Sequence, residues 1–212
     1  MVNCTILGNR AGEASFLLVD RNSNPDSSHV TVRDCILSNG DHEISSNDSP
    51  VEIAYTCISS GIAAQGNEKD WLVLGMGNIE ADPCVVDPGH WDANGTADDP
   101  NDDFFVEGDY HLKSQAGRWD EVGGSWVQDD VTSPCIDAGD PNTLIMREPF
   151  PNGGVINMGA CGGTVQASKS YFGAPLCETI IAGDINGDCR VDLADIAILL
   201  DHWLETGLKV EE

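Results

Sequence analysis

The chain has 212 residues, and its 36 Asp and Glu residues against 10 Lys and Arg residues give it a formal net charge of −26. This acidity argues against a nucleic-acid-binding protein, because phosphate recognition requires basic patches, and it disfavours adsorption to anionic membranes. Every apolar run is shorter than the roughly 18 residues that a membrane-spanning helix needs, so we expect no membrane span.

The first 60 residues contain one short β-rich pattern three times. The segments VNCTILGN, VTVRDCILSNG and VEIAYTCISSG each combine apolar and β-branched residues with a cysteine (Cys4, Cys35 and Cys57) and close on Gly or Asn. Repeats of this length with Asn and Gly turns favour a parallel β-helix, with the three cysteines stacked in neighbouring coils. The alternative is a β-sandwich, which requires hairpin signals at closer spacing. Because the first residues already resemble strand and turn, we expect the C-terminal piece of a longer secreted protein.

The next feature is an acidic segment, residues 81–109. It is rich in turn residues, which favours a solvated insertion between two coils. Two functional interpretations remain open beside that one: a carboxylate pair that cleaves glycosidic bonds, or a second calcium site. The calcium site would use Asp98, Asp99, Asn101, Asp102 and Asp103.

Five aromatic residues in and after this segment allow two interpretations. Exposed aromatic rings stack on sugar rings, whereas aromatic residues in loops more often attach the loop to the core. The residues concerned are Trp91, Phe104, Phe105, Trp119 and Trp126. The sequence therefore permits carbohydrate contact without establishing it.

Residues 126–173 are expected to close the end of the solenoid. The turns within SPCIDAGDP and NMGACGGT suit tight corners, and a cap of this kind protects an open strand edge from aggregation. We expect Asp137 and Asp140 to have a structural role here, as acceptors for backbone amides.

The last element is a calcium-loop pattern at residues 184–195, DINGDCRVDLAD. Oxygen-bearing side chains occur at loop positions 1, 3, 5, 9 and 12, and position 7 can offer its backbone carbonyl, which is the ligand order of an EF-hand loop. Position 12 is Asp instead of Glu, and position 6 is Cys189 instead of Gly. The predicted Ca²⁺ ligands are Asp184, Asn186, Asp188, Arg190, Asp192 and Asp195. An acidic turn before a surface helix is the alternative.

An amphipathic helix is predicted to follow the loop. Apolar residues recur at helical spacing from Leu193 to Leu204, and Gly207 is a plausible end. A module of about 25 residues cannot bury a sizeable core, so we expect bound metal to supply much of its folding free energy. Cys177 and Cys189, on either side of the loop's first residues, form a possible disulfide.

Two resemblances accompany these motifs. GDINGDCRVDLADIAILLDHWL resembles one repeat of a type I dockerin, a module that docks secreted polysaccharide-degrading enzymes onto cohesin domains, although dockerins carry two such repeats. The resemblance implies the same six calcium ligands and a cohesin-like partner for the helix. The set GNIEADPCVVDP, DYHLKSQAG, SPCIDAGDP and NMGACGGT resembles the C-terminal end of right-handed β-helix proteins of environmental bacteria, and implies a late strand at residues 109–112.

We therefore expect a mainly β protein in three parts. Residues 1–175 form the end of a right-handed parallel β-helix, including the acidic insertion 81–109 and the cap 126–173. Residues 176–182 form a linker, and residues 183–207 form a small α module with the calcium loop.

The expected function is that of a calcium-binding, non-catalytic C-terminal region of a secreted or cell-surface protein, which serves attachment or assembly in polysaccharide degradation or carbohydrate binding. One alternative is a fragment of a β-helix polysaccharide lyase or glycoside hydrolase, for which Arg10, Arg33 and Lys69 are the basic candidates in the repeat region. Another is a surface adhesin in which the calcium loop only stabilises the C-terminus.

Overall fold

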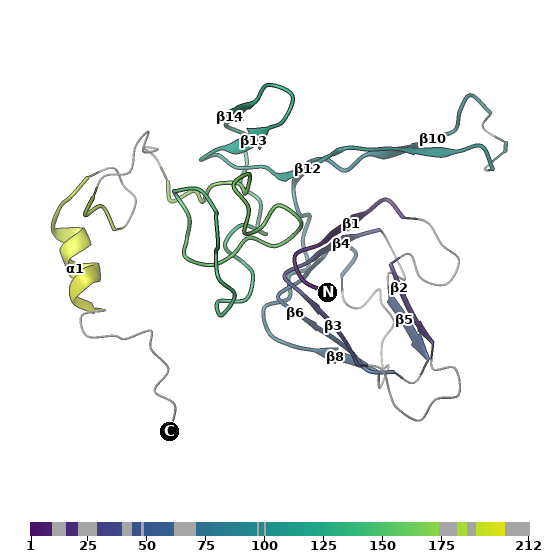
Figure 1. The fold of residues 1–212 in the computed structure, drawn as a ribbon, viewed down its shortest axis with the longest axis horizontal. Coiled ribbons are helices and arrows are strands. Elements are labelled where there is room, and N and C mark those ends of the chain that lie inside the picture. Colours follow the sequence, from purple (N-terminus) through teal and green to yellow (C-terminus); the bar gives the residue numbers. More distant parts are fainter. Residues whose placement is uncertain are drawn as a thin grey trace. The chain divides into compact units, whose positions relative to one another are not determined.

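The computed structural model describes residues 1–9, 16–20, 29–39, 44–47, 49–61, 71–96, 98–99, 101–173, 182–185 and 190–201. The chain divides into two compact units, Met1–Ser170 and Tyr171–Glu212. Within the described residues, unit 1 contains the strands and unit 2 contains one short helix, α1 (Leu193–Asp201) (Figure 1). The prediction of a mainly β chain with a small helix is therefore confirmed. None of the described helical structure is long and apolar enough to cross a membrane.

Short parallel strands form three small sheets in the first part of unit 1, and none of these sheets closes on itself (Figure 1). The first sheet contains β1 (Thr5–Leu7), β4 (Ile36–Ser38) and β7 (Cys57–Ile58); the second contains β3 (Val30–Arg33), β6 (Val51–Ala54) and β8 (Leu72–Leu74); the third contains β2 (Leu17–Asp20) and β5 (Ile44–Asn47). All pairs within these sheets are parallel. The three segments that repeat in the sequence thus form strands that pair with one another in parallel.

Two apolar clusters lie on opposite faces of the first sheet. The coil core contains Val32, Cys35, Leu37, Ile44, Val51, Ile53 and Ile58, so all three parallel sheets contribute to it. The closing core contains Leu7, Ile36, Cys57, Val85, Leu112, Cys135, Ile136 and Met158. Successive side chains of a strand point to opposite faces, so adjacent residues of β4, Ile36 and Leu37, belong to different cores.

The predicted stack of three cysteines is correct for two of them. Cys4 and Cys35 both precede the paired residues Thr5 and Ile36, whereas Cys57 pairs with Ile36 itself, one position later. A shift of one residue moves a side chain to the other face of a sheet. Cys35 therefore lies in the coil core and Cys57 in the closing core, and both are fully buried.

Beyond β8 the strand pairing becomes antiparallel. Three pairs form: β9 (Val85–Asp87) with β12 (Asp109–Leu112), β10 (His90–Asp92) with β11 (Phe104–Val106), and β13 (Arg118–Asp120) with β14 (Ser125–Val127). The strand expected at residues 109–112 is present, but it pairs with β9 in antiparallel orientation. Figure 1 shows β10 on a long arm that extends from β12. The acidic insertion is thus an ordered hairpin over much of its length.

Two aromatic residues attach this hairpin to Gly8, the residue that follows β1. The Trp91 indole Nε1–H donates to the Gly8 carbonyl oxygen at 2.6 Å, and the Trp91 and Phe105 rings meet edge to face at 5.7 Å. Gly8 has φ +69°, and a Cβ there would lie 2.4 Å from Phe105, so the contact requires glycine. For Trp91 and Phe105, the interpretation that aromatic residues attach a loop to the core is confirmed. Phe104 is exposed.

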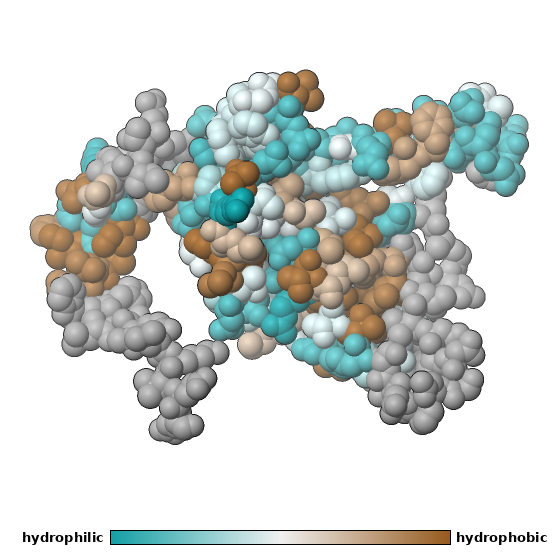
Figure 2. Space-filling view, in the orientation of Figure 1, coloured by the Kyte–Doolittle hydropathy of each residue, from teal (hydrophilic) through white to brown (hydrophobic). Residues whose placement is uncertain are grey.

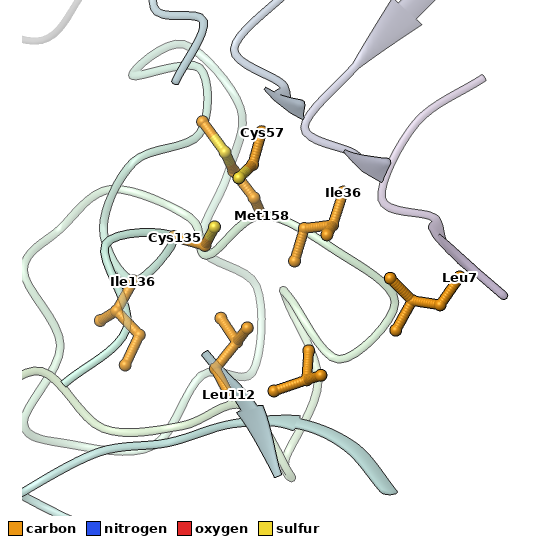
Figure 3. Packing of buried hydrophobic residues seen from close by; sticks show 8 residues of the cluster. Leu7, Ile36, Cys57, Leu112, Cys135, Ile136 and Met158 are labelled. Atoms are coloured by element: carbon orange, nitrogen blue, oxygen red, sulfur yellow. The ribbon is translucent and has the colours of Figure 1, made fainter. Parts of the chain in front are cut away.

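Residues 133–170 consist of turns that cover the first parallel sheet. Figure 3 shows Ile36, Leu112 and Met158, from three separate parts of the chain, converging in the closing core. Asp137 Oδ1 accepts the Gly153 N–H at 3.0 Å. The predicted structural roles are confirmed, because Asp140 Oδ1 likewise accepts a backbone N–H, that of Asn142, at 2.9 Å.

Two further contacts join these turns to the parallel strands. Asp34, which is fully buried, accepts the Asp140 N–H at 2.6 Å through its Oδ1. The Arg33 guanidinium forms an ion pair with the Asp140 carboxylate. Arg33 therefore has a structural partner, whereas the other two basic candidates, Arg10 and Lys69, lie outside the described residues.

The buried Glu148 accepts hydrogen bonds that hold the last turns of unit 1 in place. The effect of substituting it on the free energy of unfolding should depend on pH. Glu148 Oε1 accepts the N–H groups of Asn157 and Gly163, each at 2.8 Å, while Oε2 is buried without a hydrogen-bond partner among the described residues. Burial raises the pKa of Glu148. A raised folded-state pKa gives stability that is present at low pH and is lost as the pH rises through that pKa.

Glu148→Gln should therefore be at least as stable as the wild type at pH 7.5, since an amide oxygen still accepts both N–H groups and no charge is buried. Its advantage should shrink near pH 4.5. Glu148→Ala should lose about 2–4 kcal/mol at both pH values, because two buried N–H groups lose their acceptor. Urea unfolding at the two pH values measures both effects. A glutamine variant as unstable as the alanine variant would contradict the assignment.

Candidate functional site

The predicted calcium loop belongs to unit 2, where four of its six ligand positions are described; Asn186 and Asp188 lie outside the described residues. Asp195, at loop position 12, is 2% exposed although most residues around it are exposed. Its carboxylate accepts the Ile185 N–H and the Asp192 N–H, each at 2.7 Å. One buried carboxylate thus connects the beginning and the end of the loop.

The start of helix α1 continues this arrangement. Asp192 Oδ1 accepts the Ala194 N–H at 2.8 Å, as a helix-capping residue does. The donor set is entirely oxygen, which is what a hard cation such as Ca²⁺ binds, and a buried carboxylate at position 12 fits it. The described residues nevertheless contain no group of three His, Cys, Asp or Glu side chains arranged to hold a metal ion. Asp184, Asp192 and Asp195 are therefore close in sequence but are not gathered around one point.

The apolar side chains of α1 are exposed within unit 2. Leu193 is 80% exposed and Leu200 63%, with Ile196 and Leu199 near one half. Figure 2 shows brown, hydrophobic residues over much of the helix. The predicted helix positions Trp203 and Leu204 lie outside the described residues, as do Cys177 and Cys189 of the possible disulfide.

The described carboxylates of the acidic arm accept hydrogen bonds from neighbouring side chains of the arm. The Thr96 hydroxyl donates to Asp102 Oδ1 at 2.7 Å, and the Asn101 side-chain amide donates to Asp99 Oδ1 at 2.7 Å. These carboxylates therefore accept hydrogen bonds within the hairpin turn. The absence of a three-ligand group in the described residues applies to this arm as well.

The structure contains a pocket in unit 1 that sequence reasoning missed. Its volume is about 380 Å³, and it lies between β12, the turn that joins β13 to β14, and the turn at residues 160–161. Three carboxylates line it together with an imidazole and a thiol; the five residues are Glu107, Asp109, Glu121, His111 and Cys161. The pocket thus brings together titratable groups from three separate segments.

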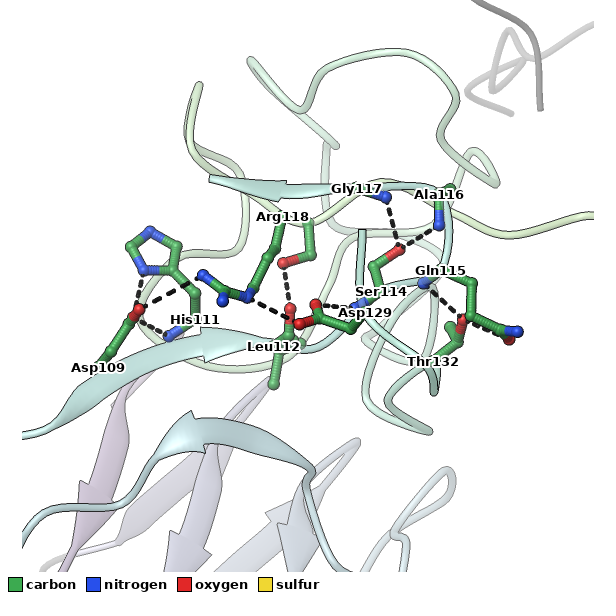
Figure 4. A network of polar contacts seen from close by, with 11 residues as sticks. Asp109, His111, Leu112, Ser114, Gln115, Ala116, Gly117, Arg118, Asp129 and Thr132 are labelled. Carbon is green, nitrogen blue, oxygen red and sulfur yellow. Dashed lines mark hydrogen bonds and ion pairs between the residues drawn. The ribbon is translucent and has the colours of Figure 1, made fainter. Parts of the chain in front are cut away.

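His111 is held in one orientation by its strand neighbour. Asp109 and His111 are two residues apart in β12, so their side chains lie on the same face. His111 Nδ1 lies 2.7 Å from Asp109 Oδ1, and the backbone N–H of His111 donates to the same oxygen at 3.1 Å (Figure 4). Arg118 Nη1 lies 3.6 Å from Asp109 Oδ2, and Arg118 Nε donates to Asp129 at 3.1 Å, which fixes the carboxylate in turn.

The surroundings of His111 favour its protonated form. Interaction with Cys161, and then with Asp109, raises the pKa of His111 to about 9 although burial acts in the opposite direction. The spacing of Asp109 and His111 on one strand was a usable sequence signal, whereas nothing local connects His111 with Cys161, fifty residues later.

Comparison with known proteins corrects the family resemblances inferred from the motifs. The family model described as "Disaggregatase related" matches residues 9–139, more than half of the chain. No dockerin model matches, so the dockerin assignment is wrong, and the cohesin-like partner inferred from it has no remaining basis. The ligand spacing of a single calcium loop is a local pattern, which acidic turns share, and it does not identify a family. No curated protein and no solved structure matches the chain significantly. By its matched residues, the chain belongs to the Disaggregatase-related family.

Proposed function

We propose that this chain is a calcium-binding, non-catalytic part of an extracellular protein, in which a right-handed parallel β-helix presents a carbohydrate-binding surface. The order of the strands supports the β-helix. Along the chain, β3, β4 and β5 enter the second, first and third sheets in turn, and β6 returns to the second sheet beside β3. All three sheets enclose the coil core, as the faces of one solenoid do.

A binding role is supported by what the described polar residues do. The turn aspartates 137 and 140 accept backbone N–H groups, and Arg33 is paired with Asp140. These groups stabilise the closure of the coils and are therefore committed to structure. Proton abstraction or glycosidic cleavage requires an acid and a base placed across a substrate, and these three side chains are instead held by structural partners.

One observation carries the proposal of carbohydrate contact: a pair of tryptophans on the β13–β14 hairpin. Trp119 and Trp126 face each other across the strands with their rings edge to face at 5.7 Å, and Trp126 is 36% exposed. Lys169 Nζ lies 4.2 Å from the centre of the Trp126 ring and holds it in place. A rigid, partly exposed indole with a neighbouring cation and nearby carboxylates suits a sugar ring, which needs both stacking and hydrogen bonds.

The proposal assigns calcium to unit 2. The ligands would be Asp184, Asn186, Asp188, Asp192 and Asp195 with the carbonyl of Arg190. Bound calcium would supply folding free energy to a unit whose described residues are mostly exposed. In this proposal the protein acts outside the cell or at the cell surface.

The test is affinity electrophoresis of the wild-type chain in gels that contain uronate-rich or neutral polysaccharides. We expect retardation by at least one polysaccharide, and Trp126→Ala should weaken it roughly tenfold, because an exposed Trp at the centre of a contact contributes strongly. Val122→Ala is the control, since Val122 is fully exposed in the same hairpin. Release of reducing ends or of unsaturated products from any retained polysaccharide would favour the lyase or hydrolase alternative.

Wild-type protein that no polysaccharide retards, or equal retardation of wild type and Trp126→Ala, would contradict the proposal. Deletion of residues 183–212 separates it from the adhesin alternative, in which the calcium loop only stabilises the C-terminus. If the calcium loop only stabilises the C-terminus, its deletion should make unit 1 less stable. The present proposal predicts that the stability of unit 1 is unchanged.

A further inference from the structure

The pocket beside β12 carries two carboxylates that no described group of the protein neutralises. Glu107 and Glu121 are exposed residues that line it, and neither has a hydrogen bond or an ion pair within the described residues. The third carboxylate, that of Asp109, is engaged by His111 and Arg118. The described lining residues include no Lys or Arg. The pocket therefore presents uncompensated negative charge.

A buried imidazole nitrogen in the wall of this pocket is a separate observation that points to a ligand. The His111 side chain is 6% exposed, and its Nδ1 is engaged by Asp109. The other ring nitrogen, Nε2, is turned away from Asp109 (Figure 4), and it is buried without a hydrogen-bond partner in the part of the chain that the structure describes. Such an atom costs free energy that a bound hydroxyl group would recover. A hydroxyl both donates and accepts, so it pairs with Nε2 in either protonation state.

The pocket also has the size and the position of a sugar subsite. Its volume of about 380 Å³ falls within the range of small-molecule sites. Glu121 lies in the turn of the β13–β14 hairpin, two residues after Trp119, and Figure 1 shows this hairpin beside β12. An oligosaccharide that stacks on the partly exposed indole of Trp126 can therefore extend toward the pocket.

We propose that this pocket is a subsite for a cationic amino sugar, whose ammonium group pairs with Glu107 and Glu121 and whose ring hydroxyl pairs with His111 Nε2. This subsite rests on the proposed carbohydrate function and names a ligand class for it. An ammonium group donates three charge-assisted hydrogen bonds, which suits two carboxylates without partners. An N-acetylated sugar lacks the positive charge, and a uronate would place a further negative charge beside the glutamates.

Two tetrasaccharides test the choice of ligand, because they share their linkage and differ only in whether the amines are acetylated. One consists of glucosamine and the other of N-acetylglucosamine. Isothermal titration of the full chain at about 0.15 M salt measures both affinities, since screening at this salt limits attraction by distant exposed charges. We expect the glucosamine tetrasaccharide to bind at least about tenfold more tightly. Equal affinities, or tighter binding of the acetylated tetrasaccharide, would overturn the proposal.

A preference that arises in the pocket must be separated from one that arises from the overall net charge of −26. Glu121→Gln should weaken binding of the glucosamine tetrasaccharide about tenfold and leave binding of the acetylated one unchanged. Glu80→Gln is the matched control, because it removes the same charge from an exposed residue of unit 1 that does not line the pocket. The control should change the affinity by less than about twofold. Equal losses in the two variants would indicate general charge attraction and would overturn the proposal.

The role of His111 has a readout that a purely structural role would not move. In protein labelled with nitrogen-15, the glucosamine tetrasaccharide should shift the Nε2 resonance of His111 and leave that of His29, which lies near Glu52, unchanged. The resonance is assigned by its loss in His111→Gln. A His111 resonance that stays in place at saturating tetrasaccharide would overturn the contact with this nitrogen.

The titrations and the gel assay together separate failure of the subsite from failure of the proposed function. Retardation of a polysaccharide that depends on Trp126, together with equal binding of the two tetrasaccharides, overturns the amino-sugar subsite alone. Absence of retardation by any polysaccharide, together with glucosamine tetrasaccharide binding that depends on Glu121, overturns the stacking site on Trp126 alone.

Discussion

Asp195→Asn is expected to weaken calcium binding by unit 2 at least about tenfold and to remove any calcium-dependent gain of helix, because charge count in the ligand set tunes affinity in loops of this kind. Asp195 occupies the position that contributes most to such a site. It is also the one carboxylate of the described loop that is already buried, where it holds the backbone of Ile185 and Asp192. Asparagine retains an acceptor oxygen but removes the charge.

Isothermal titration of metal-free protein with calcium measures the affinity, and far-UV circular dichroism measures the helix. Asp201→Asn is the matched control, since it makes the same change at the end of α1, outside the loop. The control should bind calcium as the wild type does. Metal-free wild-type protein that neither binds calcium nor changes its spectrum on addition would reject the calcium site itself.

Ile36→Ala is expected to destabilise unit 1 by about 2–5 kcal/mol, the range for removing a large aliphatic side chain from a packed core. Ile36 is fully buried in β4 and packs in the closing core between the parallel strands and the turns at residues 135–159. Gly159 packs directly against Ile36, because a Cβ there would lie 2.7 Å from Ile36 Cδ1, and a glycine has no side chain that could move into the space left by the substitution. The cavity left by the substitution is therefore hard to fill.

Urea unfolding followed by tryptophan fluorescence measures this loss. Leu144→Ala is the control: Leu144 is in the same unit and 79% exposed, so its truncation should change stability by less than about 0.5 kcal/mol. Equal unfolding midpoints for Ile36→Ala and the control would mean that the closing core does not stabilise the unit.

The parallel strands could be predicted from sequence because their information is local. Each repeat carries its own apolar run and its own Gly or Asn turn, so the strand positions near Cys4, Cys35 and Cys57 follow from the pattern. The turn roles of Asp137 and Asp140 were predictable for the same reason, since the N–H groups that donate to their carboxylates belong to turns of the same closing segment. The register of the strands was harder to predict from sequence. The cysteine of the third repeat is displaced by one residue relative to the first two, and no local sequence pattern indicates a shift of one residue.

The pocket and the change to antiparallel pairing depend on contacts distant in sequence. The β9 strand pairs with β12 across an arm whose length the sequence does not limit. His111 and Cys161 line one pocket only because residues 133–170 fold back over the parallel strands. For the calcium loop, a local pattern was given too wide a meaning. The spacing of its residues indicates candidate calcium ligands, but the same spacing was also taken as evidence of a family. The family match covers a different part of the chain.

The division of β4 between two cores has a consequence for how unit 1 unfolds. Ile36 and Leu37 are neighbours, yet Leu37 packs in the core shared by the parallel sheets and Ile36 packs in the core shared with the closing turns. Loss of order in either core therefore removes half of the packing of this strand. The parallel sheets and the closing turns should melt in one transition, because neither can lose its core without exposing one face of β4.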